Sequence, residues 1–230
     1  MYAWVAMLLP YRTDTPIYHW PYATVGLIFV NTVVFLLCLS GHIDEQSLVL
    51  PWGSIDIWQW VTSIFAHAGF LHLIGNMIVL WTFGIIVEGK VGVLRFLLIY
   101  FAICLTSCAL EQVLMLGAAE GGSLGASGVI FGLMGIAMIW APKNHVEVFY
   151  WVWFTLIGSF TMSIQGAVFL IVAIEFFFQL LFTSVGIYMT SMTLHLLGAA
   201  LGVVLGIYLV RSGRVDCEGW DWFSVHSRIA

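Results

Sequence analysis

Long apolar runs, interrupted by short polar stretches, follow one another along most of the chain. A helix that crosses a bilayer needs about 20 predominantly apolar residues, and the lengths of the runs predict six such helices. They are expected at residues 22–40, 71–87, 93–116, 127–141, 165–182 and 187–210. The pattern therefore predicts an all-α fold, a polytopic membrane protein whose residues 22–210 form a six-helix membrane domain.

The composition excludes a soluble globular domain. Of the 230 residues, 62% are hydrophobic and 8% are charged, whereas a soluble domain has roughly 45–50% and about 25%. The sequence shows neither a strongly basic stretch nor a glycine-rich phosphate loop, so no nucleic acid is expected as a partner. The four cysteines have no paired metal-ligand spacing and are expected to be small core residues.

The basic residues indicate the orientation in the membrane. In the six-helix arrangement all seven Lys and Arg residues fall on one side, namely Arg12, Lys90, Arg95, Lys143, Arg211, Arg214 and Arg228. Because Lys and Arg accumulate in short cytoplasmic loops, we expect both terminal segments, residues 1–21 and 211–230, to be cytoplasmic. The loops at 41–70, 117–126 and 183–186 then face outward.

One apolar stretch, residues 146–182, is too long for one membrane helix and short for two. Two spans here would place Arg211 and Arg214 outside. The distribution of basic residues therefore favours one helix at 165–182. An aromatic segment at 148–160 would precede it and lie on the cytoplasmic face.

Four polar side chains on three predicted helices share the outer half of the membrane. His72 and Asn76 lie one turn apart near the outer end of the second helix. Ser127 begins the fourth helix, and His195 lies on the order of 12 Å below the outer end of the sixth. Since polar groups inside a bilayer are costly, they mark a functional site by default.

These residue types suit nucleophilic acyl transfer. A histidine that takes its proton would activate the Ser127 hydroxyl, and His195 is the candidate base. The N–H groups at the start of the fourth helix, with His72 and Asn76, could stabilise the oxyanion that forms on attack. Small residues let membrane helices approach closely, and glycines recur on both helices: Gly125, Gly128, Gly132 and Gly135 on the fourth, Gly198, Gly202 and Gly206 on the sixth.

Three motifs, in this order, resemble those of the rhomboid intramembrane serine proteases, in particular the bacterial six-helix type. They are His67-Ala-Gly-Phe-Leu-His72-Leu-Ile-Gly-Asn76-Met, Gly125-Ala-Ser127-Gly128 and His195-Leu-Leu-Gly198-Ala-Ala-Leu-Gly202. The resemblance covers most of the chain. It implies a serine endopeptidase with a Ser–His dyad and no third acidic member.

The resemblance also implies a role for each residue of the site. Ser127 would be the nucleophile and His195 the base, while His72 and Asn76 would be the oxyanion donors. The residues implied to line the substrate cavity are Gly125, Gly128 and Phe131. The sequence departs from the residues common in the family at Gln59, Phe131 and Leu194, and none of these departures removes a catalytic group.

The expected partners follow from the same resemblance. Single-span membrane proteins would be the substrates, cut in or near the outer half of the lipid bilayer. Neither a metal nor an organic cofactor is expected. Since the compact six-helix form resembles bacterial members, the expected location is a bacterial inner or plasma membrane, with the protein as a multi-pass integral component.

Two other functions stay open on the sequence alone. A catalytically inactive rhomboid-like protein would use the same bundle to bind membrane clients. Alternatively, His67, His72 and His195 could be metal or haem ligands, although no further ligand lies at a matching depth. Glu175 and Gln179, one turn apart on the fifth predicted helix, are expected to bond each other or a neighbour.

Fusions of a topology reporter test the orientation without any measurement of activity. Fusions after Arg12, Lys90, Lys143 and Arg214 should report cytoplasmic, and fusions near Gln46, Ala119 and Ser184 should report outside. The decisive pair is Lys143 and Ser184, which lie on opposite sides if residues 146–182 cross once. If both report the same side, His195 enters from the cytoplasmic face, and its pairing with Ser127 at the outer end of the fourth helix is impossible.

Overall fold

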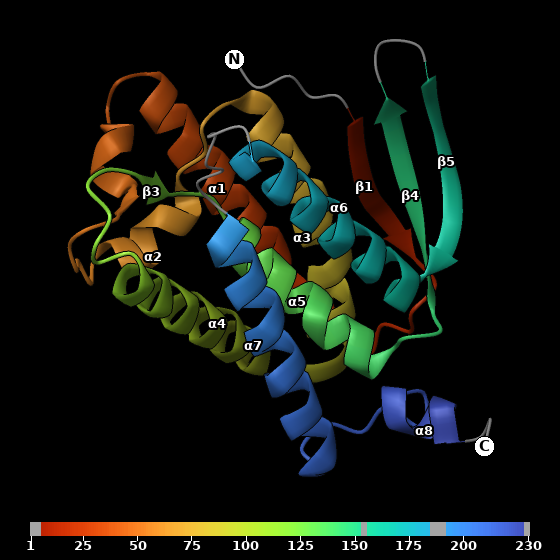
Figure 1. Cartoon of the computed structure of the whole chain (residues 1–230). Coiled ribbons are helices and arrows are strands. Elements are labelled where there is room, and N and C mark those ends of the chain that lie inside the picture. The colour runs from red at the N-terminus through yellow and green to blue at the C-terminus, as the bar shows by residue number, and fades with distance from the viewer. Residues whose placement is uncertain (1–5, 153–155, 185–191, 228–230) are drawn as a thin grey trace.

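The computed structural model describes residues 6–152, 156–184 and 192–227, in which six long helices form a bundle (Figure 1). They are α1 (Tyr22–Leu39), α3 (Phe70–Val91), α4 (Val93–Leu114), α5 (Ser127–Trp140), α6 (Ile164–Ser184) and α7 (Met192–Arg211), each overlapping one predicted run. By length and composition α1, α3, α4 and α7 can cross a membrane, and shorter apolar helices lie in α5 and α6. The predicted helical membrane bundle is confirmed, and the number of spans stays a prediction.

The connection between α1 and α3 is tied to the loop that precedes α5. It contains the short elements η1 (Glu45–Leu48), β2 (Leu50–Pro51), α2 (Gln59–Thr62) and η2 (Ser63–Phe65). Strand β2 pairs antiparallel with β3 (Gly122–Ser123). In addition, the backbone amide of Gly125 donates to the carbonyl oxygen of Ser63 at 2.8 Å. These bonds fix the loop that leads into α5.

Helix α5 lies at the centre of the bundle. All of its residues except Met138 are buried, and it packs against α3, α4, α6 and α7. A Cβ atom added at Gly198 would overlap the carbonyl oxygen of Gly128, and one added at Gly202 would overlap that of Gly132. The backbones of α5 and α7 are therefore in direct contact, as the glycine pattern predicts.

A buried carboxylate joins the start of α1 to the end of α3. Helix α1 has no side-chain cap of its own, which leaves N–H groups without intrahelical partners. Glu88, fully buried, accepts hydrogen bonds from the amides of Ala23 and Thr24 at 2.8 and 2.7 Å and from the Thr24 hydroxyl at 2.7 Å. Because negative charge is also favourable at a helix N-terminus, Glu88 fixes α1 against α3.

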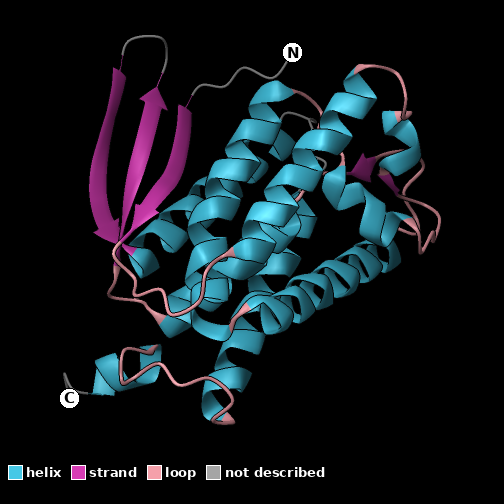
Figure 2. Ribbon diagram, turned by 180° about the vertical axis from the view of Figure 1, so that it is seen from behind, coloured by secondary structure: helices cyan, strands magenta, loops and turns pink. Residues whose placement is uncertain are grey.

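A three-stranded antiparallel sheet flanks the bundle beside α3 and α6 (Figure 2). Its order is β1 (Ala6–Thr13), β4 (His145–Val152) and β5 (Leu156–Ser163). Strand β1 packs on α3, where the Thr82 hydroxyl donates to the carbonyl oxygen of Pro10 at 2.9 Å. The sheet thereby connects the N-terminal segment to the hairpin that precedes α6.

The sheet is an addition to the helical fold that the sequence analysis did not predict. In the segment 148–160, expected only as an aromatic segment at the membrane interface, residues 148–152 belong to β4 and residues 156–160 to β5. Buried and more exposed side chains alternate on β4, where Val146 and Val148 are buried and Glu147 is half-buried. Its partner β1 lies more than 130 residues away in the sequence, with Thr13 opposite Val146, so local pattern gave no sign of the pairing.

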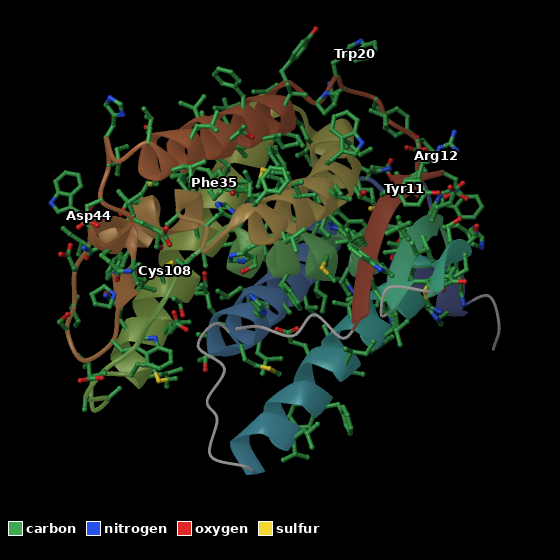
Figure 3. The ribbon with its side chains drawn as sticks, turned by 90° about the horizontal axis from the view of Figure 1, so that it is seen from above. Tyr11, Arg12, Trp20, Phe35, Asp44 and Cys108 are labelled. Carbon is green, nitrogen blue, oxygen red and sulfur yellow. The ribbon has the colours of Figure 1, made fainter. Side chains whose placement is uncertain are left out.

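Large apolar side chains cover the outer surface of the bundle. Phe29 on α1, Leu98 on α4 and Phe176 on α6 are each more than half exposed. Trp20, 75% exposed, projects away from the helices just before α1 (Figure 3). An apolar surface of this kind is unfavourable in water and suits contact with lipid.

The segment after α7 returns to the bundle as the short helix α8 (Trp222–Ser227). The carboxylate of Asp221 accepts hydrogen bonds from the amides of Phe223 and Ser224 and so caps this helix. The Arg211 guanidinium, at the end of α7, lies 3.9 Å from the centre of the Phe223 ring. This cation–π contact holds α8 against the end of α7.

The contact between α5 and α7 predicts opposite effects for two Gly→Ala substitutions. Gly202→Ala places a methyl group on the Gly132 backbone and should lower the thermal unfolding temperature in detergent, since overpacking costs about 1–3 kcal/mol or more. Gly26→Ala, also within a helix but with no atom within 4 Å of the added Cβ, should leave it unchanged or raise it. Equal unfolding temperatures for the two variants would contradict this packing.

Candidate active site

Ser127 and His195, 68 residues apart in sequence, are hydrogen-bonded in the structure. Ser127 is the first residue of α5 and is 5% exposed. Its Oγ atom lies 2.7 Å from Nε2 of His195, which belongs to the first turn of α7. Gly128 follows Ser127 by one residue, Gly198 follows His195 by three, and these two glycines are in contact. The packing of the two helices therefore brings the side chains of Ser127 and His195 together.

Phe131 fixes the plane of the His195 ring. It lies one turn after Ser127 on α5, and its ring stacks on the imidazole with a centroid distance of 4.5 Å and an interplanar angle of 6°. Stacking restricts rotation of the imidazole and leaves both of its ring nitrogens accessible in the plane. The sequence departure at Phe131 therefore keeps the aromatic contact.

The second ring nitrogen of His195 faces a carboxylate. Nδ1 lies 2.6 Å from Oε1 of Glu175 on α6. Sequence reasoning assigned Glu175 to a bond with Gln179 or a neighbour and did not place it at this site. The available signal was an acidic residue within an apolar helix, which needs a partner in the membrane.

His72 and Asn76 converge on the loop before Ser127. A Cβ atom at Gly125 would lie 2.9 Å from Cε1 of His72 and 3.2 Å from Nδ2 of Asn76. Gly125 has a φ of +103°, a conformation that favours glycine. The buried Nδ2 atom of Asn76 has no hydrogen-bond partner in the described part of the chain. The structure therefore brings both side chains to the start of α5, with an amide donor left free.

His67 lies behind His72 in the loop before α3. The two rings meet edge to face with centroids 5.2 Å apart, and Nδ1 of His67 donates to the carbonyl oxygen of Phe65 at 3.3 Å. Burial, with a smaller contribution from His72, lowers the pKa of His67 to about 4. This ring is therefore neutral at pH 7 and supports His72 from one side.

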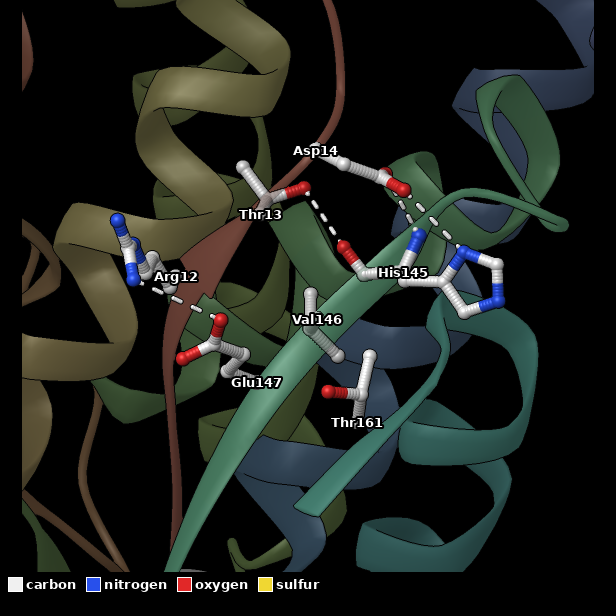
Figure 4. Close-up of a pocket in the computed structure, with 7 residues that line it drawn as sticks. All are labelled: Arg12, Thr13, Asp14, His145, Val146, Glu147 and Thr161. Carbon is white, nitrogen blue, oxygen red and sulfur yellow. Dashed lines mark hydrogen bonds and ion pairs between the residues drawn. The ribbon is translucent and has the colours of Figure 1, made fainter. Parts of the chain in front are cut away.

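The structure describes no metal centre at these histidines. Within residues 6–152, 156–184 and 192–227, no three His, Cys, Asp or Glu side chains are grouped so that they could hold a metal ion. A polar pocket of about 370 Å³ lies elsewhere, where β1 and β4 begin to pair (Figure 4). Its polar side chains contact one another: Arg12 pairs with Glu147 at 3.6 Å, and Oδ2 of Asp14 lies 3.2 Å from Nδ1 of His145. No residue of the Ser127 site lines this pocket.

The apolar helical bundle and its polar centre define a class of protein, the polytopic membrane proteins with a serine and a histidine paired between two closely packed helices. A family model of the rhomboid domain matches residues 54–212. The chain belongs to the rhomboid family, and the resemblance found in its motifs is confirmed.

Curated relatives from several organisms carry rhomboid names. The chain is 39% identical over 145 residues to rhomboid protease GluP of Bacillus subtilis (strain 168), which covers 58% of this chain and 28% of the relative. It is 29% identical over 129 residues to rhomboid protease GlpG of Yersinia pseudotuberculosis serotype I (strain IP32953). This match covers 53% of this chain and 45% of the relative. The chain is 26% identical over 134 residues to rhomboid-like protease 3 of Toxoplasma gondii. This match covers 53% of this chain and 50% of the relative. The chain thus spans half or less of the length of these relatives.

Proposed function

We propose that the protein is an intramembrane serine protease that cleaves single-span membrane proteins in or near the outer half of the bilayer. The observation that carries the proposal is the 2.7 Å hydrogen bond between Ser127 Oγ and His195 Nε2 inside an apolar bundle. The names of the relatives, which are rhomboid proteases, support the same activity.

The proposed reaction begins with a proton transfer between these two side chains. Ser127 Oγ attacks the carbonyl carbon of the scissile peptide bond, and its proton passes to Nε2 of His195. The tetrahedral intermediate collapses when the same proton is given to the leaving amine. Water then hydrolyses the acyl-enzyme with His195 again as the base.

The negative oxygen of the tetrahedral intermediate needs donors at the start of α5. Backbone N–H groups at a helix N-terminus have no intrahelical partners and carry partial positive charge. The side chains of His72 and Asn76 complete this oxyanion site in our proposal, and the free Nδ2 of Asn76 supports it. Glycine at positions 125 and 128 and the Phe131 ring would line the cavity for the substrate backbone.

The proposed setting is a bacterial inner or plasma membrane with both termini in the cytoplasm. The apolar outer surface supports contact with lipid, and transmembrane proteins are the partners that share this environment. The proposed chemistry uses side chains of the chain itself and requires neither a metal nor an organic cofactor. A rhomboid-like protein that only binds membrane clients is the alternative, and the following experiment separates the two.

Substitution of either proposed catalytic residue should abolish proteolysis. Ser127→Ala and His195→Ala are each expected to stop cleavage of a single-span substrate and covalent labelling by a fluorophosphonate, while thermal unfolding in detergent is retained. The double variant should be no worse than either single one, because the two residues act as a unit. A Ser127→Ala variant that cleaves at the wild-type rate contradicts the proposal, and a folded wild-type protein that neither cleaves nor labels favours the client-binding alternative.

Substitution of an oxyanion donor should have a graded effect. Asn76→Ala is expected to lower kcat by about 10²–10³-fold with little change in KM, since an oxyanion donor acts mainly in the transition state. Steady-state cleavage measured against substrate concentration separates the two parameters. A variant whose KM rises while kcat stays constant would place Asn76 in substrate binding instead.

A further inference from the structure

Glu175 occupies the side of His195 opposite to Ser127. Its Oε1 atom lies 2.6 Å from Nδ1 of His195, while the serine Oγ lies 2.7 Å from Nε2. The carboxyl group belongs to α6, a helix whose sequence contains no other charged residue. Its side chain is 26% exposed, so it is neither sealed in the core nor free on the surface.

We propose that Glu175 is the third member of a catalytic triad, a positioning residue that holds His195 in the form required of a base. This inference rests on the function proposed above and adds an acidic residue where the motif resemblance implied only a dyad. The carboxylate acts through His195 and touches no reacting atom.

The two hydrogen bonds of His195 require one tautomer. To accept the proton of Ser127, Nε2 must carry no hydrogen, so the hydrogen of the neutral ring must be on Nδ1. An ionised Glu175 accepts only, and its bond to Nδ1–H selects this tautomer. A protonated Glu175 that donates to Nδ1 would leave the hydrogen on Nε2, and His195 could then take no proton from the serine.

The carboxylate also offsets the charge that forms during the reaction. When the bond from Oγ to the carbonyl carbon forms, the serine proton moves to Nε2 and the ring becomes an imidazolium. The Glu175 carboxylate, 2.6 Å from Nδ1, stabilises this cation. When the C–N bond breaks, the proton leaves Nε2 with the amine, and Glu175 is unchanged.

Other groups around His195 do not replace this carboxylate. Phe131 stacks on the ring and offers no acceptor, and His72 on α3 is an imidazole, which brings no negative charge. On α4, the carboxyl group of Glu111 accepts a hydrogen bond from Ser123 at 2.9 Å. Among the described residues, Glu175 is the carboxylate that is bonded to His195.

The rate of labelling by a fluorophosphonate, measured against pH, tests the triad without a known substrate. Glu175→Gln should slow labelling by about tenfold or more and move the acidic limb of the profile to lower pH by about one unit, because the imidazolium loses a neighbouring negative charge. Glu175→Asp keeps the negative charge. It should recover part of the labelling rate, and the acidic limb of its pH profile should lie near the wild-type position.

A matched control separates catalysis from stability. Glu88→Gln likewise removes a carboxylate that is hydrogen-bonded within the bundle, one that caps α1, and should lower the unfolding temperature without moving the pH profile. A Glu175→Gln profile that keeps its wild-type limb, while Ser127→Ala abolishes labelling, overturns the triad and leaves the proposed protease intact. Absence of labelling in the folded wild-type protein overturns both.

Nuclear magnetic resonance of the wild-type protein, labelled with ¹⁵N at histidine, gives a second test that does not depend on a Glu175 variant. The His195 ring, assigned by its loss in His195→Ala, should carry its hydrogen on Nδ1 when neutral. A neutral ring with the hydrogen on Nε2 overturns the triad even if Glu175→Gln does not fold.

Discussion

The close contact between the backbones of α5 and α7 determines the geometry on which the rest of the site depends. Lipid chains are as apolar as leucine, so helices in a membrane associate through close packing and not through exclusion of water. Gly128 and Gly198 allow the carbonyl oxygen of one helix to reach the backbone of the other. Ser127 and His195 lie next to this contact, and their 2.7 Å separation is a consequence of it.

Much of this arrangement is encoded locally in the sequence. Apolar runs of the length of a bilayer predicted the helices, and the spacing of glycines predicted which two would meet. The positions of Ser127 and His195, counted from the expected outer ends of their helices, placed both in the outer half of the membrane. These inferences use only patterns within individual helices and the direction in which each helix runs.

The features that the sequence did not predict depend on relations between distant segments. Strand β4 pairs with β1, more than 130 residues earlier, and neither strand can satisfy its backbone hydrogen bonds without the other. The sequence shows Glu175 as an acidic residue in an apolar helix, which is energetically unfavourable without a partner. The rotation of α6 about its axis, however, decides whether the carboxyl group faces His195 or lipid. That rotation is set by the packing of α6 on α5 and α7. The residue pattern within α6 alone does not predict this packing.

The buried polar groups divide according to how completely they are bonded. The Glu88 carboxylate accepts three hydrogen bonds from the start of α1, as expected of a group with a purely structural role, because unpaired buried charge is expensive. Asn76, by contrast, keeps a buried amide donor without a partner in the described chain. An unsatisfied donor costs free energy in the resting protein, and that cost is recovered if a negative oxygen forms beside it. The contrast between these two residues of one helix supports the proposal that the oxyanion forms near Asn76, in the N-terminal half of α3, whereas Glu88 has a structural role near the other end of the helix.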